Sequence, residues 1–66
     1  MEQGYITILD FEIGKVFQYE VADLKMQTEA CEQFIEDKGH NITNCEWMMH
    51  KDGTIYKALF YLESKD

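Results

Sequence analysis

The chain has 66 residues, with 13 Asp and Glu against six Lys and no Arg, and its formal charge is -7 at pH 7. This composition argues against direct nucleic-acid binding, because a phosphate-binding surface needs clustered cations, and Arg is the usual bidentate ligand of phosphate and guanine. The anionic field repels anionic membranes and favours encounter with a basic surface on another protein.

A chain of this length is expected to form one small domain, residues 1–66, which buries only about 60% of the surface of its unfolded state. The hydrophobic share of 45% predicts a folded protein rather than a disordered one. The N-terminus lacks the features of a secretion signal, and no apolar run approaches the ~20 residues that span a bilayer. We therefore expect a cytoplasmic protein in which Cys31 and Cys45 are reduced.

Apolar residues alternate with polar ones over residues 5–9 and 16–21, a pattern that predicts a β-hairpin. A two-residue loop at Ile13 and Gly14 would place Ile8 opposite Tyr19. A four-residue loop is the alternative, and it would leave the same side chains on each face of the sheet.

The next segment predicts the single helix of the fold. Thr28 is expected as its N-cap and Gly39 as the residue that ends it. Between them, residues at helical spacing form one apolar stripe, made of Ala30, Cys31, Phe34 and Ile35.

A second hairpin is predicted over residues 44–62, where two alternating apolar runs flank Asp52 and Gly53. An Asp-Gly pair in this position is typical of a two-residue loop whose central residues both have positive φ. In this register Trp47 lies opposite Ala58, which pairs a large side chain with a small one.

The predicted fold is therefore α+β, in the order ββαββ, with the helix packed on one face of a four-stranded, antiparallel-rich sheet. The face under the helix is expected to contain Ile6, Ile8, Phe17, Tyr19, Cys45, Trp47, Ala58 and Phe60. One helix cannot cover both faces, so the other face is left open. It is expected to contain Tyr5, Thr7, Leu9, Gln18, Glu20, Glu46, Met48, Ile55, Leu59 and Tyr61.

The open face is more apolar than a solvated sheet face, and Tyr and Met are enriched at protein interfaces. We therefore expect a non-catalytic protein-binding module that uses this face, with a homodimer as one possible assembly. Scattered surface hydrophobes are the alternative interpretation. The predicted contact residues are the apolar anchors Tyr5, Leu9, Met48, Ile55, Leu59 and Tyr61, with Glu20 and Glu46 at the rim.

The helix also presents an acidic face, made of Glu29, Glu32, Glu36 and Asp37. This face is either a solvated surface or an imitation of nucleic-acid phosphates directed at a basic host site. In size, charge and lack of Arg and Pro, the chain resembles the small acidic inhibitors that bacteriophages make against host enzymes. The resemblance implies an inhibitor of viral origin, and it assigns no role to individual residues.

Two Cys and two His raise the question of a zinc site, because thiolate and imidazole are the ligands that zinc prefers. The spacing of Cys31, His40, Cys45 and His50 does not fit one, and Cys45 and His50 leave opposite faces of their strand. Buried Cys side chains and exposed His side chains at element ends account for these residues. Because both thiols fall on core faces, we expect no catalytic residue, no metal and no cofactor.

Overall fold

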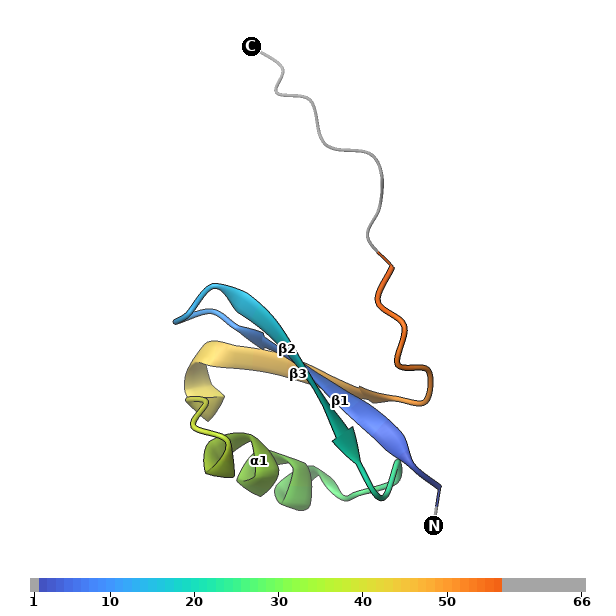
Figure 1. Ribbon diagram of the computed structural model, residues 1–66. Helices are drawn as coiled ribbons and strands as arrows, with labels where there is room; N and C mark the ends of the chain where they lie inside the picture. The colour runs from blue at the N-terminus through green and yellow to red at the C-terminus, as the bar shows by residue number, and fades with distance from the viewer. Residues whose placement is uncertain (1, 57–66) are drawn as a thin grey trace.

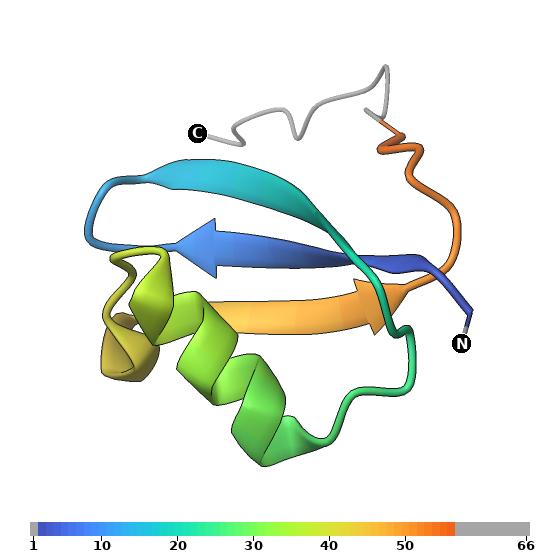
Figure 2. The same cartoon turned by 60° about the horizontal axis from the view of Figure 1, so that its bottom comes forward.

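The computed structural model describes residues 2–56. Strands β1 (Gly4–Asp10), β2 (Lys15–Val21) and β3 (Cys45–His50) form an antiparallel sheet in the order β2-β1-β3. Helix α1 (Thr28–Asp37) lies on one face, and the short helix η1 (Ile42–Asn44) leads from it into β3 (Figures 1 and 2). The α+β class is thus confirmed, with three strands in the described part, whereas the fourth strand and the ββαββ order are not confirmed.

The first hairpin pairs β1 with β2 in a register that differs by two residues from the two-residue-loop prediction. Ile8 lies opposite Phe17 and Asp10 lies opposite Lys15, so that the loop has four residues, 11–14. The prediction that Ile8 faces Tyr19 is therefore wrong. Because the shift is even, each side chain stays on its predicted face.

The side chain of Asp10 organises this four-residue loop. Its Oδ1 accepts hydrogen bonds from the backbone N–H groups of Glu12 (3.0 Å) and Ile13 (3.1 Å). Gly14, at φ +76°, donates its own N–H to the Asp10 carbonyl at 2.7 Å. Gly14 alone takes the positive φ in this loop, so that β-branched Ile13 keeps an unstrained backbone.

Helix α1 begins one residue earlier than a Thr28 N-cap would give. Gln27 occupies the N-cap position, and its side chain makes no capping hydrogen bond. Thr28 is the first helical residue, so the predicted N-cap is wrong by one position. Helix boundaries commonly differ by one or two residues at each end.

The C-terminus of α1 ends as predicted at Gly39, whose φ is +90°. The Gly39 N–H donates to the Glu36 carbonyl at 2.9 Å, and the His40 N–H donates to the Ile35 carbonyl at 3.2 Å. This pair of bonds is a Schellman motif, which needs a residue with positive φ at the Gly39 position. It reverses the chain and turns His40 back toward the sheet.

The core lies between α1 and the sheet. Its buried apolar side chains come from all three strands and from the helix, and they are Ile6, Ile8, Val21, Cys31, Ile35 and Cys45. Phe17, Tyr19, Phe34 and Trp47 pack against this cluster and are partly buried. The predicted core face of the sheet is thus confirmed for the described residues. The predicted apolar stripe of the helix is confirmed except for Ala30, which is exposed. Ala58 and Phe60 lie outside the described residues.

The predicted turn at Asp52 and Gly53 is wrong. Neither residue has positive φ, and residues 51–56 belong to no strand. Instead the Asp52 Oδ1 accepts from the Thr54 N–H at 2.9 Å, and the Asp52 carbonyl lies 2.7 Å from His50 Nδ1. These bonds turn the chain away from β3 and over the sheet face opposite α1 (Figure 1).

Gly53 is needed at this point for close approach rather than for its φ. A Cβ atom added to Gly53 would lie 2.8 Å from Cζ of Tyr5 and 3.0 Å from its Cε1. The backbone of Gly53 therefore rests on the Tyr5 ring, and no larger residue fits without displacing it.

We expect Gly53→Ala to lower the free energy of unfolding by about 1–2 kcal/mol, the usual cost of overpacking, as measured by urea denaturation. In a Tyr5→Ser background the same substitution should cost almost nothing, because the clashing ring is gone. An undiminished cost in that background would show that Gly53 is required by a turn with positive φ instead.

Candidate functional site

The sheet face opposite α1 is built from three rows of side chains that cross the sheet. The strand registers align Val16, Leu9 and Glu46 in one row and Gln18, Thr7 and Met48 in the next. Glu20, Tyr5 and His50 form the third row. We call this surface the open face. It brings together the predicted contact residues Tyr5, Leu9, Glu20, Glu46 and Met48.

The third row is partly covered by the chain itself. Gly53 rests on the ring of Tyr5, and the Tyr5 and His50 rings stack with their centroids 6.0 Å apart. His50 Nε2 is hydrogen-bonded to the Thr7 hydroxyl, while its Nδ1 donates to the Asp52 carbonyl. Tyr5 is therefore a partly buried support of this end of the sheet, not an exposed anchor.

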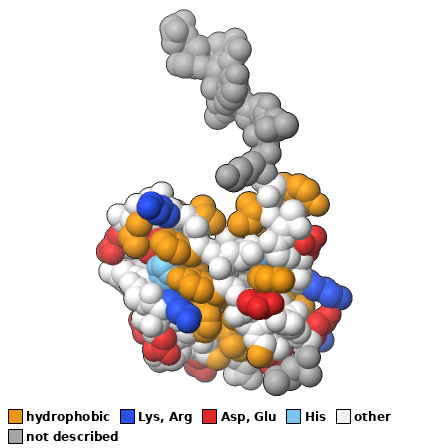
Figure 3. Space-filling view, viewed as in Figure 1, with side chains coloured by type: hydrophobic (Ala, Val, Ile, Leu, Met, Phe, Trp, Pro, Cys, Tyr) orange, Lys and Arg blue, Asp and Glu red, His pale blue; other side chains and the backbone are white. Residues whose placement is uncertain are grey.

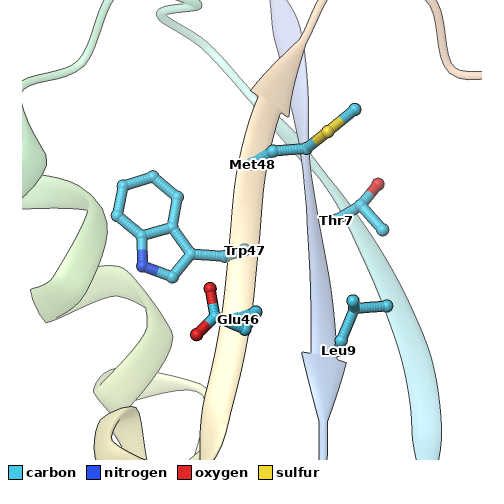
Figure 4. A pocket seen from close by; sticks show the side chains of 5 residues that line it. All are labelled: Thr7, Leu9, Glu46, Trp47 and Met48. Carbon is cyan, nitrogen blue, oxygen red and sulfur yellow. The ribbon is translucent and has the colours of Figure 1, made fainter.

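The other two rows contain three exposed apolar side chains. Leu9 is 41% exposed, Val16 56% and Met48 60%. Thr7, Leu9, Glu46, Trp47 and Met48 line a hollow of about 190 Å³ between β1 and β3 (Figure 4). The Trp47 ring extends toward α1, whereas Thr7, Leu9 and Met48 extend to the other side of the sheet.

A second hollow extends this apolar surface toward the hairpin tip. It also measures about 190 Å³, and its lining includes Leu9, Phe11, Gly14 and Val16. Phe11 is 61% exposed. Sequence reasoning missed it as a contact residue, because it lies in the hairpin loop and outside the alternating pattern of the strands. Leu9 lines both hollows, so it is the centre of one continuous surface. We call Leu9, Phe11, Val16 and Met48 the apolar patch.

Of the predicted contact residues, Leu9 and Met48 belong to this patch, whereas Tyr5, Glu20 and Glu46 lie elsewhere on the open face. Ile55 follows the turn at Asp52, lies outside the sheet and is half exposed. Leu59 and Tyr61 lie outside the described residues. The prediction of a contact surface thus stays a prediction, now centred on the end of the face where β1 enters the hairpin loop.

The acidic helix residues Glu29, Glu32, Glu36 and Asp37 are all exposed, as predicted for a surface face. Among the described residues, none of these carboxylates forms an ion pair with a Lys or His. Asp37 accepts a hydrogen bond from Gln33 Nε2 at 3.0 Å. This face therefore presents uncompensated negative charge.

A buried polar network, which sequence reasoning missed, joins the hairpin to the end of the helix. His40 Nδ1 lies 2.6 Å from Asp10 Oδ2, and His40 Nε2 lies 2.9 Å from the Tyr19 hydroxyl. Asp10 is 3% exposed and His40 6%, so the expectation of an exposed His40 is wrong. Since the carboxylate can only accept, Nδ1 donates to Asp10, and in the neutral ring Nε2 accepts from Tyr19.

The network satisfies every polar atom that it buries. Asp10 Oδ1 is occupied by the loop N–H groups, and no buried side-chain N or O atom of the described residues lacks a partner. The hydrogen bond from the His40 ring holds the pKa of the Asp10 carboxyl below its ordinary value, against the opposing effect of burial. Asp10 thus stays ionised and ties the hairpin loop to the end of α1.

The Cys and His side chains are engaged within the fold. Both ring nitrogens of each His are hydrogen-bonded to protein groups, and Cys31 and Cys45 are buried and free. Burial raises the pKa of both thiols, which disfavours the reactive thiolate. Within residues 2–56, no group of three or more His, Cys, Asp or Glu side chains is placed to hold a metal ion.

Neither a membrane-spanning helix in the described part of the chain nor a related protein guides the interpretation of this surface. In the part of the chain that the structure describes, no helix has both the length and the apolar composition needed to cross a bilayer. Searches against protein-family models, curated proteins and solved structures find no match for this chain. The candidate site therefore rests on its own geometry.

The Asp10 network predicts a specific dependence of stability on pH. Because the pKa of Asp10 is depressed in the folded state, its contribution to stability is present above the ordinary value of 3.8 and is lost as the pH falls below it. We expect Asp10→Asn to lower the urea midpoint at neutral pH and to flatten its decline in acid.

Glu36→Gln is the matched control, since it removes one exposed carboxylate from the helix surface. It should leave both the neutral midpoint and the acid decline close to those of the wild type. If Asp10→Asn declines in acid as steeply as the wild type, the carboxylate does not stabilise the fold in this way.

Proposed function

We propose that this protein is a small acidic, non-catalytic module that binds another protein through the apolar patch on its open face. The observation that carries the proposal is the continuity of the patch. Leu9 lines both hollows, and each of its neighbours in the patch is at least half exposed. Contiguous apolar surface of this kind on a small domain commonly marks a contact site.

The charge of the chain supports a partner with a basic surface. A net charge of -7 accelerates encounter with positive surfaces, while the patch supplies the desolvated centre of the contact. Glu20 and Glu46, both exposed, stand at the ends of two of the rows and supply charge at the rim. An inhibitor of a host enzyme, in a cytoplasmic setting, is the specific role that we propose.

The direct test replaces the centre of the patch. We expect Leu9→Ser combined with Met48→Ser to weaken binding to a captured partner by about tenfold or more, because central apolar anchors carry most of the binding energy. Ala30→Ser, on the exposed helix surface, is the control and should bind like the wild type. Unchanged affinity of a folded double variant would exclude the patch as the contact.

The alternative function is nucleic-acid mimicry by the acidic helix face, which the uncompensated carboxylates of α1 favour. Charge reversal of Glu29, Glu32 and Glu36 to Lys should then abolish binding, while the Leu9 and Met48 variant should retain it. Mimicry also predicts a steep loss of affinity with added salt, because exposed charges are screened within about 10 Å at 0.1 M ionic strength. Isothermal titration at several salt concentrations separates the two functions.

A homodimer in which two open faces bury each other is a further outcome of these experiments. It would appear as a concentration-dependent mass in light scattering. The Leu9 and Met48 variant would abolish it, whereas charge reversal on α1 would not.

A further inference from the structure

We propose that the outer edge of β2 pairs with the same edge of a second copy of this chain, joining two three-stranded sheets into one antiparallel sheet. This edge borders the apolar patch, and Val16 is the one residue that belongs to both. The inference does not depend on the proposed function.

The outer edge of β2 is free among the described residues. β2 stands at one end of the strand order and pairs with β1 over its whole length on its inner side. No backbone hydrogen bond from the described residues reaches its outer side. β2 crosses in front of the other strands in Figure 1, so Figure 3 shows this edge, with a diagonal band of hydrophobic side chains along it.

The edge has few of the devices that normally prevent strand pairing. Proteins protect such edges with proline, with β-bulges or with charged side chains, especially Lys. The chain has no proline, and the ladder between β2 and β1 runs through seven consecutive pairs without a bulge. The charged residues of β2 are Lys15, at its first position, and Glu20, near its end. The middle of this edge, between these two charged residues, is a template for another strand.

The sequence of β2 is suited to pairing with itself. An antiparallel two-fold arrangement centred on Gln18 brings all seven residues into register, and each residue meets one that projects from the same face. Every outward N–H and C=O group then meets a counterpart. On the open face this register places Val16 opposite Glu20 of the second copy.

On the helix side the same register joins two aromatic pairs. The Phe17 and Tyr19 rings are nearly parallel, with centroids 6.5 Å apart, and both side chains are only partly buried. In the dimer, Phe17 lies opposite Tyr19 of the second copy, so the exposed remainder of both rings is covered. Cross-strand aromatic pairs are among the most favourable in antiparallel sheets.

The charge of β2 itself does not oppose the meeting of two acidic chains. The single Lys and single Glu of β2 balance, whereas the whole chain carries -7. The remaining repulsion between two copies is screened by salt, so added salt should strengthen the dimer. Binding of a basic partner should respond in the opposite direction.

The test uses the opposed pair of Val16 and Glu20 in the full chain. Val16→Glu places like charges opposite each other twice in the dimer, and we expect about tenfold or more weaker self-association. Val16→Lys places opposite charges there, and it should associate at least as tightly as the wild type. Sedimentation velocity across chain concentrations up to about 1 mM covers the range expected of a contact this small.

Gln33→Glu and Gln33→Lys are the controls, because they make the same changes of net charge on the exposed surface of α1. They should alter the dissociation constant less than twofold. The proposal is overturned if the wild type is a monomer throughout, which includes the case in which residues 57–66 occupy the edge. It is also overturned if Val16→Glu and Val16→Lys weaken association equally, as an apolar contact through the open face would require.

Discussion

A single helix can cover only one face of a sheet, and this constraint sets the character of the whole molecule. Ile6 and Ile8 of β1 point toward α1 and are fully buried. Leu9, Val16 and Met48, on the other side of the sheet, are exposed. In the described residues, the helix and the three-stranded sheet form a single two-layer core. Apolar residues on the second face of the sheet must therefore remain in contact with water, with the segment after β3, or with another molecule.

The Asp10, His40 and Tyr19 network explains how so small a core holds its helix in place. A glycine-ended helix delivers His40 to the sheet, and the carboxylate of Asp10 binds that imidazole and the hairpin loop together. Each buried side-chain N and O atom of the described residues is partnered, so the network adds specificity without leaving an unsatisfied side-chain group there. The same loop carries Phe11 to the edge of the apolar patch. Asp10 therefore ties the hairpin loop, which carries one residue of the candidate site, to the end of the helix.

The side of the sheet on which each residue lies could be predicted from sequence, because alternation has a period of two and survives a change of loop length. The loop itself could not, since its length depends on hydrogen bonds from the Asp10 side chain. Asp10 continues the alternation of Ile6 and Ile8, and that parity was the available signal that a carboxylate enters the core. No comparable signal existed for His40, whose burial follows from tertiary packing. The Asp-Gly pair led to a wrong turn prediction, because Gly53 allows the backbone to approach the Tyr5 ring closely and does not adopt a positive φ.

The central claim is that the apolar patch faces solvent in the free protein while the residues under α1 do not. Methyl NMR of the full chain at low concentration, with a water-soluble paramagnetic probe, measures this directly. The account predicts strong broadening of the Leu9 and Met48 methyl signals and little effect on those of Ile8 and Ile35. Equal protection of Leu9, Met48 and the core methyls in a monomer would contradict it, because the chain would then cover its own open face.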